Sequence, residues 1–335
     1  MRGPLLAAAL ALAAPAAARA QSAGFPVEVV GAVAPEGGKG SLILVGRSGQ
    51  LYVAGADRVW RRKAAGGVAI DVRAAVRSPT RPAEVIAIGD EAPPFRFSGA
   101  AWSADMVGNR GPTALGRGGG VPALAVGRHV YTLEPVKDDW VRRVSAAKVA
   151  TAVWAASDKS ILVATSDGGL ARWDGKRLTP MKTGLAAGDP VVLLLGNQPR
   201  QVYGKSKAGR WIRVNGASVA QVAFDRALDG FEEHAAGIGG DGALLVAGTV
   251  PVAGGGTKPV LVRAEQIRIA PWQDLWALAD GDRFAVVAAQ GGELLVASRA
   301  GSVRVRSAAG AWVEGRVAGD LPVTKARRAP PARSR

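Results

Sequence analysis

Two histidines are the residues of this chain best suited to metal or acid–base chemistry, and neither has the neighbours that a metal site needs. His129 lies in the segment Gly127-Arg128-His129, and His234 directly follows Glu232-Glu233. Two ligands on one helical face require a spacing such as HExxH, which Glu-Glu-His lacks. The chain has no cysteine, so thiolate zinc sites are excluded. We therefore expect a hairpin turn at His129 and a surface loop at His234, and we predict no metal site and no cofactor.

Carboxylates are the other residue type that could perform catalysis, as a general acid and base pair. The candidates in predicted loops are Asp138-Asp139, Asp167, Asp225 and Asp241. No G-x-S-x-G segment marks a nucleophilic serine, and the glycine runs at 118–120 and 254–256 lack the Lys-Ser/Thr that follows a phosphate-binding loop. The sequence therefore favours a non-catalytic protein. The alternative is a hydrolase or lyase that acts on a glycan with carboxylates facing a central channel.

A hairpin pattern that recurs seven times along the chain must position these residues. Each copy is a short apolar run, a turn that usually contains glycine, and a second alternating run, most plainly in ILVATSDGGLARWDG at residues 161–175. The turn glycines are Gly49, Gly89, Gly127, Gly168, Gly209, Gly255 and Gly301, at successive spacings of 40, 38, 41, 41, 46 and 46 residues. Four-stranded propeller blades repeat at about 40–45 residues.

The pattern predicts an all-β protein with a single β-propeller domain over residues 25–320. Seven blades of four antiparallel strands fit the spacings best; six or eight blades, or a double-sheet sandwich array, are the alternatives. In the third copy, for example, strands are expected at 123–126, 130–133 and 140–144, and further strands at 149–154, 191–195 and 275–278. In the second copy, at 85–108, we expect Pro93-Pro94 to break the hairpin.

Tryptophan next to arginine is a recurring feature of the repeats. Trp60-Arg61, Trp140-Val141-Arg142 and Trp211-Ile212-Arg213 each place an indole and basic side chains close together. Residues i and i+2 of a strand share a face, so the stem of an arginine is able to lie along the indole. Packing between neighbouring blades is the preferred interpretation, and stacking on a ligand is the alternative.

One repeat resembles known propeller families. Residues 167–178 read DGGLARWDGKRL and are similar to the two-component-regulator type of propeller, whose blades carry a Gly-Leu-x-Arg-aromatic-Asp-Gly phrase. Asp167-Gly168-Gly169 followed by Trp173 also resembles, more weakly, the Asp-box turn of sialidase-type propellers, although one extra residue is present and Arg172 replaces the usual Ser/Thr. The resemblance implies a propeller fold and an extracytoplasmic binding role, and it does not extend to sialidase activity.

Residues 1–20 have the parts of a secretory signal peptide. Arg2 supplies the basic start, residues 5–14 are apolar, and Ala18 and Ala20 form an Ala-x-Ala match before Gln21. We predict cleavage after Ala20 and a periplasmic or secreted protein, with an uncleaved signal anchor as the alternative. A membrane span takes about 20 apolar residues, and no later segment meets that length, so none is expected in the mature chain. The 315 residues that remain are enough to bury a core without disulfides.

The chain is strongly basic, with a formal net charge of +16. Five of these charges lie in the tail at residues 321–335, predicted to be disordered because it lacks large apolar residues: Lys325, Arg327, Arg328, Arg333 and Arg335. We take these five as candidate binding residues, because excess positive charge favours polyanions through counterion release. No specific nucleic-acid motif is present. The sequence thus predicts a binding or scaffold protein of the bacterial cell envelope, with an envelope protein or an anionic polymer as partner; generic solubility is the alternative explanation of the charge.

Overall fold

The computed structural model describes most of the chain from residue 28 to residue 317. The described residues are 28–33, 42–54, 59–63, 71–78, 81, 84–90, 92–99, 101–105, 107, 111–116, 119–134, 136–290, 292–306 and 310–317. The predicted signal peptide at 1–20 and the predicted tail at 321–335, with its five candidate binding residues, lie outside them. The part that is described is built from strands, and its one helical segment is the short 3-10 helix η2 (Arg226–Leu228).

The strands form seven four-stranded antiparallel sheets, which we call blades 1 to 7. Blade 1 contains β1 (Val29–Val33), β2 (Ile43–Gly46), β3 (Leu51–Ala54) and β4 (Val59–Arg62). Blade 2 contains β5 (Val72–Arg77), β6 (Val85–Gly89), β7 (Phe95–Phe97) and β8 (Trp102–Ala104). Blade 3 contains β9 (Ala114–Leu115), β10 (Ala123–Val126), β11 (His129–Glu134) and β12 (Asp139–Ser145). Blade 4 contains β13 (Ala150–Ser157), β14 (Ser160–Thr165), β15 (Leu170–Trp173) and β16 (Leu178–Met181).

The remaining three blades follow the same order along the chain. Blade 5 contains β17 (Val191–Gln198), β18 (Gln201–Ser206), β19 (Trp211–Asn215) and β20 (Ser218–Phe224). Blade 6 contains β21 (Glu232–Ile238), β22 (Leu244–Pro251), β23 (Thr257–Glu265) and β24 (Arg268–Asp274). Blade 7 contains β25 (Phe284–Gln290), β26 (Glu293–Ser298), β27 (Val303–Arg306) and β28 (Trp312–Glu314), and the short β29 (Arg316–Val317) comes last.

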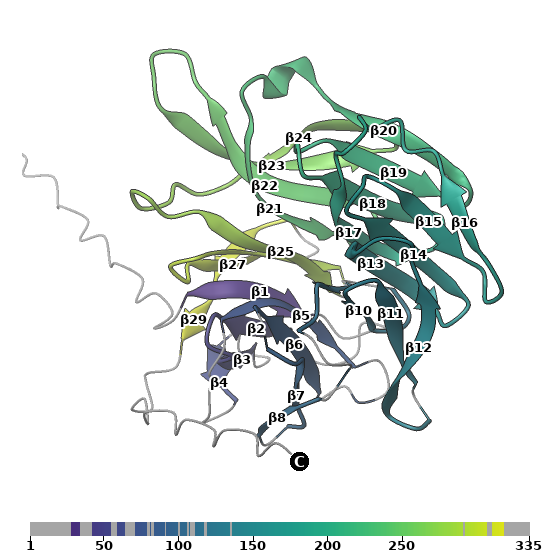
Figure 1. Ribbon diagram of the computed structural model, residues 1–335. Helices are drawn as coiled ribbons and strands as arrows, with labels where there is room; N and C mark the ends of the chain where they lie inside the picture. The colour runs from purple at the N-terminus through teal and green to yellow at the C-terminus, as the bar shows by residue number, and fades with distance from the viewer. Residues whose placement is uncertain are drawn as a thin grey trace, which may run out of the picture.

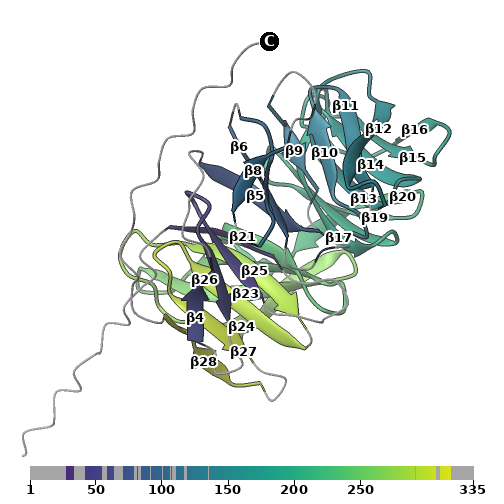
Figure 2. The same ribbon diagram turned by 90° about the horizontal axis from the view of Figure 1, so that it is seen from below.

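The blades stand side by side around a centre. Figure 1 shows β1, β13, β17, β21 and β25 toward the middle and β4, β12, β16 and β20 at the periphery. The first strands of neighbouring blades contact one another around the whole series, and β1 contacts both β5 and β25, so the sheets close into a ring. Figure 2 shows blades 3 and 4 as neighbours on one side of that ring.

Each boundary between neighbouring blades contains its own apolar cluster. The cluster between blades 1 and 2 includes Val33 and Ile43 against Val85 and Phe97, and comparable clusters fill the six other boundaries, including that between blades 7 and 1. The second strand of a blade is therefore buried on both faces, which explains its continuous apolar run. Burial of apolar surface is the main stabilising term in folding, and here each sheet obtains it from its two neighbours.

All seven predicted turn glycines mark the same place in the fold. Each lies at the end of the second strand of its blade or in the turn to the third. Gly168, for example, has φ 91° and lies directly against the backbone of Gly188 and Asp189. Only glycine enters this region of φ at little cost. Because strands alternate in direction, these turns lie at the same end of the ring as the connections between blades.

The tryptophans that precede arginine pack between blades, in agreement with the preferred interpretation. Trp60 is 1% exposed at the boundary of blades 7 and 1, Trp140 is 9% exposed between blades 2 and 3, and Trp211 is 1% exposed between blades 5 and 6. None of the three is open for stacking on a ligand.

Two local predictions about strands are wrong. Pro93-Pro94 does not break the second hairpin, because both prolines lie in the connection from β6 to β7 while Val85 still pairs with Phe97. Residues 275–278 are not a strand. They follow β24 as an irregular connection, and Trp276 packs into the boundary of blades 6 and 7. An apolar run that fills a boundary looks the same in sequence as an apolar run in a strand.

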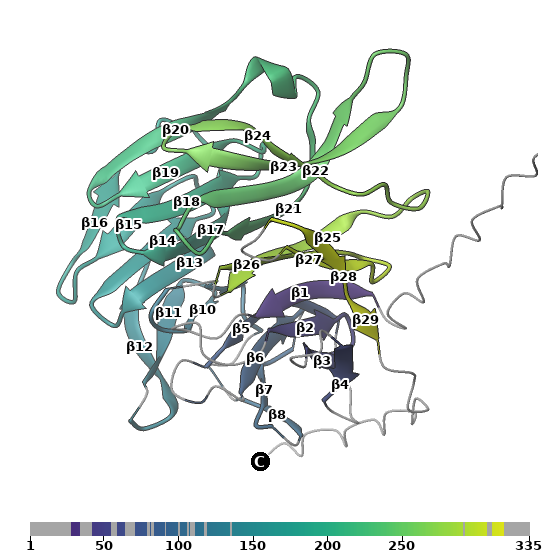
Figure 3. The same ribbon diagram turned by 180° about the vertical axis from the view of Figure 1, so that it is seen from behind.

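The outer strands of two pairs of neighbouring blades are joined by parallel pairing. β29 adds to the outer edge of blade 1, where Arg316 and Val317 pair with Val59 and Trp60 of β4 (Figure 3). β20 of blade 5 pairs in the same manner with β24 of blade 6. The last strand of the described chain thus fastens blade 7 to blade 1.

Candidate anion-binding pocket on blades 3 and 4

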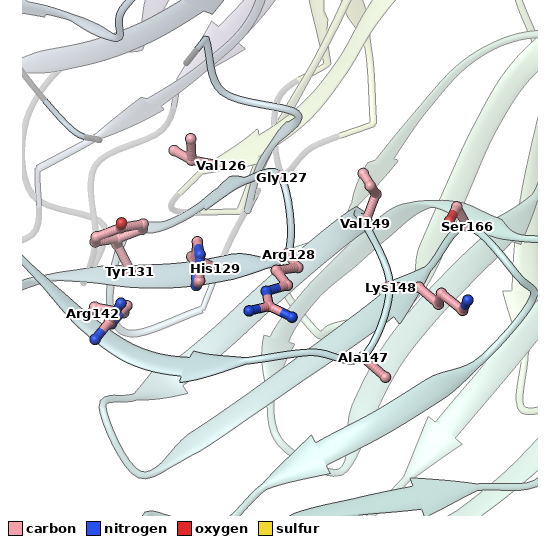
Figure 4. Close-up of a pocket in the computed structure, with 10 residues that line it drawn as sticks. All are labelled: Val126, Gly127, Arg128, His129, Tyr131, Arg142, Ala147, Lys148, Val149 and Ser166. Carbon is pink, nitrogen blue, oxygen red and sulfur yellow. The ribbon is translucent and has the colours of Figure 1, made fainter. Parts of the chain in front are cut away.

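An open pocket of about 650 Å³ lies at the end of the ring that carries the connections between blades. The turn between β10 and β11, the connection from β12 to β13 and the turn between β14 and β15 contribute to it. Its lining residues are Val126, Gly127, Arg128, His129, Tyr131, Arg142, Ala147, Lys148, Val149 and Ser166 (Figure 4). The pocket therefore combines segments that are separated by up to 40 residues in the chain.

A tight hairpin turn places Arg128 at the pocket. Val126 pairs with His129 across the turn, so Gly127 and Arg128 alone form the loop. Gly127 has φ 58°, a left-handed value, and two-residue hairpin loops favour glycine at such positions. The side chain of Arg128 is consequently exposed next to His129.

Three exposed cations give the pocket its electrostatic character. They are Arg128 in the turn, Arg142 on β12 and Lys148 in the connection to β13. Within the part of the chain that the structure describes, none of the three forms an ion pair with a carboxylate. The pocket also has no carboxylate among its lining residues. The pKa of Asp167, which is lowered mainly by its hydrogen bonds to Thr165 and Gly169, is lowered further by the charge of Lys148. The charge of Lys148 is therefore partly offset, and Arg128 and Arg142 are the cations most available to a ligand.

Arg143, the next residue on β12, differs from Arg142 because its charge is paired within the protein. Arg143 donates from Nε to Thr132 Oγ1 at 2.9 Å and lies 3.7 Å from Glu134 and 3.8 Å from Asp158, so its charge is used within the fold. The register places Arg142 opposite Tyr131 instead, on the side of the strand that lines the pocket.

His129 has a fixed place in this pocket. It is the first residue of β11, directly after the predicted turn, and it is half-buried. Its Nδ1 lies 2.7 Å from Ser145 Oγ, the hydroxyl of the residue paired with it on β12. This hydrogen bond holds the imidazole ring between Arg128 and Arg142 (Figure 4).

Comparison with known proteins identifies the architecture. No family model matches the sequence, and no curated protein matches it. The β-propeller domain of Cps50 (Swd1) from Myceliophteria thermophila matches with a TM-score of 0.60 at 12% identity, over 84% of this chain and 97% of that domain. The WD40 β-propeller domain of Doa1 matches with a TM-score of 0.60 at 13% identity, over 85% of this chain and 94% of that one. The fold is a β-propeller.

A bacterial surface protein also matches. PorZ, a surface component of the type-IX secretion system of Porphyromonas gingivalis, has a TM-score of 0.56 at 12% identity, and the match covers 91% of this chain and 40% of PorZ. At these identities the likeness shows the fold alone. The resemblance of one blade to two-component-regulator or Asp-box repeats stays a prediction.

The second histidine is not in the loop that the sequence suggested. His234 lies on β21, an inner strand of the propeller, and its side chain is 5% exposed. Its ring packs 6.0 Å from that of Phe284, and its Nε2 lies 3.8 Å from Glu232 Oε1. Burial lowers the pKa of His234. The described residues contain no group of three His, Cys, Asp or Glu side chains arranged for a metal ion.

The predicted loop carboxylates have separate local partners. Asp138 binds Arg96, Asp225 caps η2 and binds Arg268, and Asp241 binds Arg263. Asp139 accepts a hydrogen bond from the backbone of Trp140, at 2.7 Å. Asp167 accepts from the Thr165 hydroxyl at 2.7 Å and from the backbone of Gly169, and these bonds lower its pKa. Asp138 and Asp139 are neighbours in blade 3, and each of the others belongs to a different blade.

Carboxylates on the inner strands are also committed to the fold. Among the described first strands of the blades, β21 alone carries them, at Glu232 and Glu233. Glu233 accepts from Lys205 Nζ at 2.8 Å and from Trp211 Nε1 at 3.0 Å, which ties blade 6 to blade 5. Glu232 binds Arg283 at 2.9 Å. Both glutamates therefore form contacts that stabilise the fold.

The sequence did not predict a network of ion pairs that lies between blades 2 and 3. Arg96 on β7 is almost buried and contacts Asp105 at 2.8 Å and Asp138 at 2.5 Å. Burial by itself lowers the pKa of Arg96, but the hydrogen bonds to the two aspartates outweigh it and the pKa is raised. Trp140 Nε1 also donates to Asp105, at 3.1 Å. The one available signal is a charged residue inside the apolar run Phe95-Arg96-Phe97.

Proposed function

We propose that this propeller is a non-catalytic binding or scaffold protein of the bacterial cell envelope and that its ligand is anionic. The observation that carries the proposal is the open pocket on blades 3 and 4, with three exposed cations that form no ion pair among the described residues. Surface cations without a partner attract anions at long range and release counterions when they bind them.

The position and size of the pocket support a binding role. Loops that are held by a rigid frame commonly carry binding sites, and here two hairpin turns and a connection between blades are held by packed sheets. Ligand pockets generally have volumes of about 300–1,000 Å³, and this pocket, at about 650 Å³, lies in that range.

The envelope location is part of the proposal and depends on the predicted leader. In the part of the propeller that the structure describes, no helix is long and apolar enough to cross a membrane. Expression of the full chain followed by intact mass measurement of the periplasmic fraction tests the location. A mature protein that begins at Gln21 supports it, whereas a cytoplasmic protein that retains Met1 contradicts it.

Anion binding is tested with two variants of equal net charge. Arg128, Arg142 and Lys148 are replaced together by alanine. The control replaces three exposed cations in turns at the opposite end of blades 4 and 5, Lys159, Lys176 and Arg200. Heparin is the probe, and its affinity is measured by isothermal titration at several salt concentrations. Both variants lose three charges, so total charge cannot explain a difference between them.

The pocket variant should bind heparin at least about threefold more weakly than the control, because a surface ion pair contributes roughly 0.2–1 kcal/mol. The slope of log affinity against log salt should fall by about 2, since each neutralised charge contributes roughly 0.7 for a single-stranded polyanion. Equal affinities of the two variants would show that the pocket is not the anion site.

A further inference from the structure

The cations of the pocket are spread along it and do not converge on one point. In Figure 4, Arg142, Arg128 and Lys148 follow one another across the pocket, and their charged ends point into separate parts of it. Convergent donors suit one phosphate or carboxylate group, which is typically bound by several hydrogen bonds at once. A row of separated cations instead suits a chain that carries one negative charge on each of several successive units.

The surface between the cations is not purely polar. Tyr131 offers an aromatic ring beside Arg142, and Val149, which is 47% exposed, provides an apolar patch. The ligand is therefore expected to have apolar faces between its charges. Sugar rings have such faces, with C–H groups on one side and hydroxyl groups at the edge, whereas inorganic polyphosphate has none.

Hydroxyl and imidazole groups lie on the same row. Ser166 lines the pocket near Lys148, and His129 is held by its 2.7 Å hydrogen bond to Ser145 between the two arginines. These groups are suitable donors or acceptors for sugar hydroxyls. A volume of about 650 Å³ is far larger than one phosphate needs and is that of a ligand of several rings.

From this arrangement we infer that the pocket binds an acidic oligosaccharide of several units, with a carboxylate or phosphate on successive sugars. The inference depends on the proposed anion-binding function and specifies its ligand class. The chain would lie along the row from Arg142 to Lys148, with sugar faces on Tyr131 and Val149 and one acidic group near each cation.

The test is a length series. Galacturonic acid and its linear oligomers of two, four and six units are titrated into the mature protein at low ionic strength, with maltohexaose as the neutral sugar and linear polyphosphate of matched charge as the sugar-free anion. Affinity should rise about tenfold between one and four units and then stay constant, because each further surface ion pair adds a factor of about 1.4 to 5. Maltohexaose should bind at least tenfold more weakly than the hexamer, and polyphosphate more weakly than the tetramer.

Single substitutions at the two ends of the row test whether the oligosaccharide contacts both ends of the pocket. Arg142→Ala and Lys148→Ala should each weaken binding of the tetramer about threefold and reduce the dependence on length, whereas Arg200→Ala, an exposed arginine at the other end of the ring, should leave both unchanged. Unchanged thermal unfolding confirms that each variant is folded.

Three results would overturn the inference, and the first two are distinct from failure of the proposed function. Equal affinity for one and six units would indicate a site for a single anion, and polyphosphate that binds as tightly as the acidic sugar would exclude the glycan; in both cases anion binding itself stands. Absence of binding by every anion, with no effect of the substitutions, would refute the anion-binding function together with the inference.

Discussion

Replacement of Arg96 by methionine tests whether the ionic network between blades 2 and 3 stabilises the ring. Only 9% of the Arg96 side chain is exposed, and its guanidinium contacts Asp105 at 2.8 Å, Asp138 at 2.5 Å and Glu84 at 3.6 Å. Methionine keeps much of the volume and removes the charge. The variant leaves three carboxylates in a region with little access to water, and one of them, Glu84, is 5% exposed.

The expected effect is large because a buried charge loses its partner. Such a loss generally costs about 3–5 kcal/mol. Arg81 also contacts Glu84 and Asp138, at 3.0 Å each, but it is 56% exposed and offsets little of the loss. We expect the free energy of unfolding to fall by about 3 kcal/mol, which corresponds to a decrease in Tm of roughly 6–12 °C for a large domain.

Calorimetry and urea unfolding at neutral pH measure this effect, with Arg81→Met as the matched control. The control removes an arginine from the same network at an exposed position, so it should cost less than about 1 kcal/mol. If both variants lower Tm equally, or if Arg96→Met lowers it by less than about 2 °C, burial does not determine the strength of this network and the reasoning is wrong.

Three other perturbations test other parts of the molecule. Gly315→Ala places a Cβ 2.7 Å from Trp60 Nε1, where blade 7 meets blade 1. We expect the free energy of unfolding in urea to fall by about 1–3 kcal/mol because of this close contact. A variant as stable as the parent would contradict the close contact. Burial lowers the pKa of His234, so the unfolded state binds more protons than the folded state, and the free energy of unfolding falls as the pH drops below about 6.5. His234→Gln should make thermal stability less dependent on pH in this range. An unaltered pH profile of the variant would exclude His234 as the source of the dependence. Deletion of residues 325–335, which removes five charges, should reduce the salt dependence of heparin retention, and unchanged elution would remove the tail from the binding surface.

Local periodicity was enough to predict the architecture. The turn glycines were recognisable because a hairpin imposes its chemistry on residues that are adjacent in sequence: Gly127 and Gly168 adopt left-handed φ in turns that repeat once per blade. Burial of both faces of a sheet likewise shows as an apolar run, as in Ile43–Gly46.

Features that depend on neighbouring blades could not be predicted in this way. His234 follows two glutamates and has the sequence context of a loop, yet it lies on an inner strand, because the seven-residue run 232–238 pairs with β22. Arg96 finds its partner Asp138 42 residues away, across a blade boundary. Such contacts depend on how neighbouring blades are placed relative to each other, and the spacing of residues in the sequence does not predict that placement.

The pocket illustrates the same limit. The sequence singled out basic charge and predicted the tail as its site, and that prediction lies outside the described residues. Among the described residues, Arg128, Arg142 and Lys148 line one pocket. Trp140 and Arg142 were expected to share a face, and that expectation by itself did not show that Tyr131 lies opposite Arg142 or that Lys148 approaches from the next connection. A short signal was available in Gly127-Arg128-His129, where a basic residue occupies the tip of a tight turn.

Two aspartates occupy equivalent places in blades 5 and 7 that the sequence did not predict. Asp189 and Asp282 each lie two residues before the inner strand of their blade. Each accepts a hydrogen bond from a backbone amide in the turn between the second and third strands of that blade, at 2.9 and 3.1 Å. Both follow the same partial pattern, since Gly188-Asp189 recurs as Gly281-Asp282. The pair fixes the turns at the end of the ring on which the pocket lies.

Every blade is a continuous stretch of chain, and this determines which apolar surface the final packing step covers. Blades 1 to 6 can pack against one another in chain order, but the surface of blade 1 that includes Leu44, Tyr52 and Trp60 is covered by blade 7 alone. In a folding intermediate that lacks a packed blade 7, this apolar surface is exposed to solvent. Such an intermediate is expected to aggregate through blade 1, and a chaperone that binds this surface would protect it.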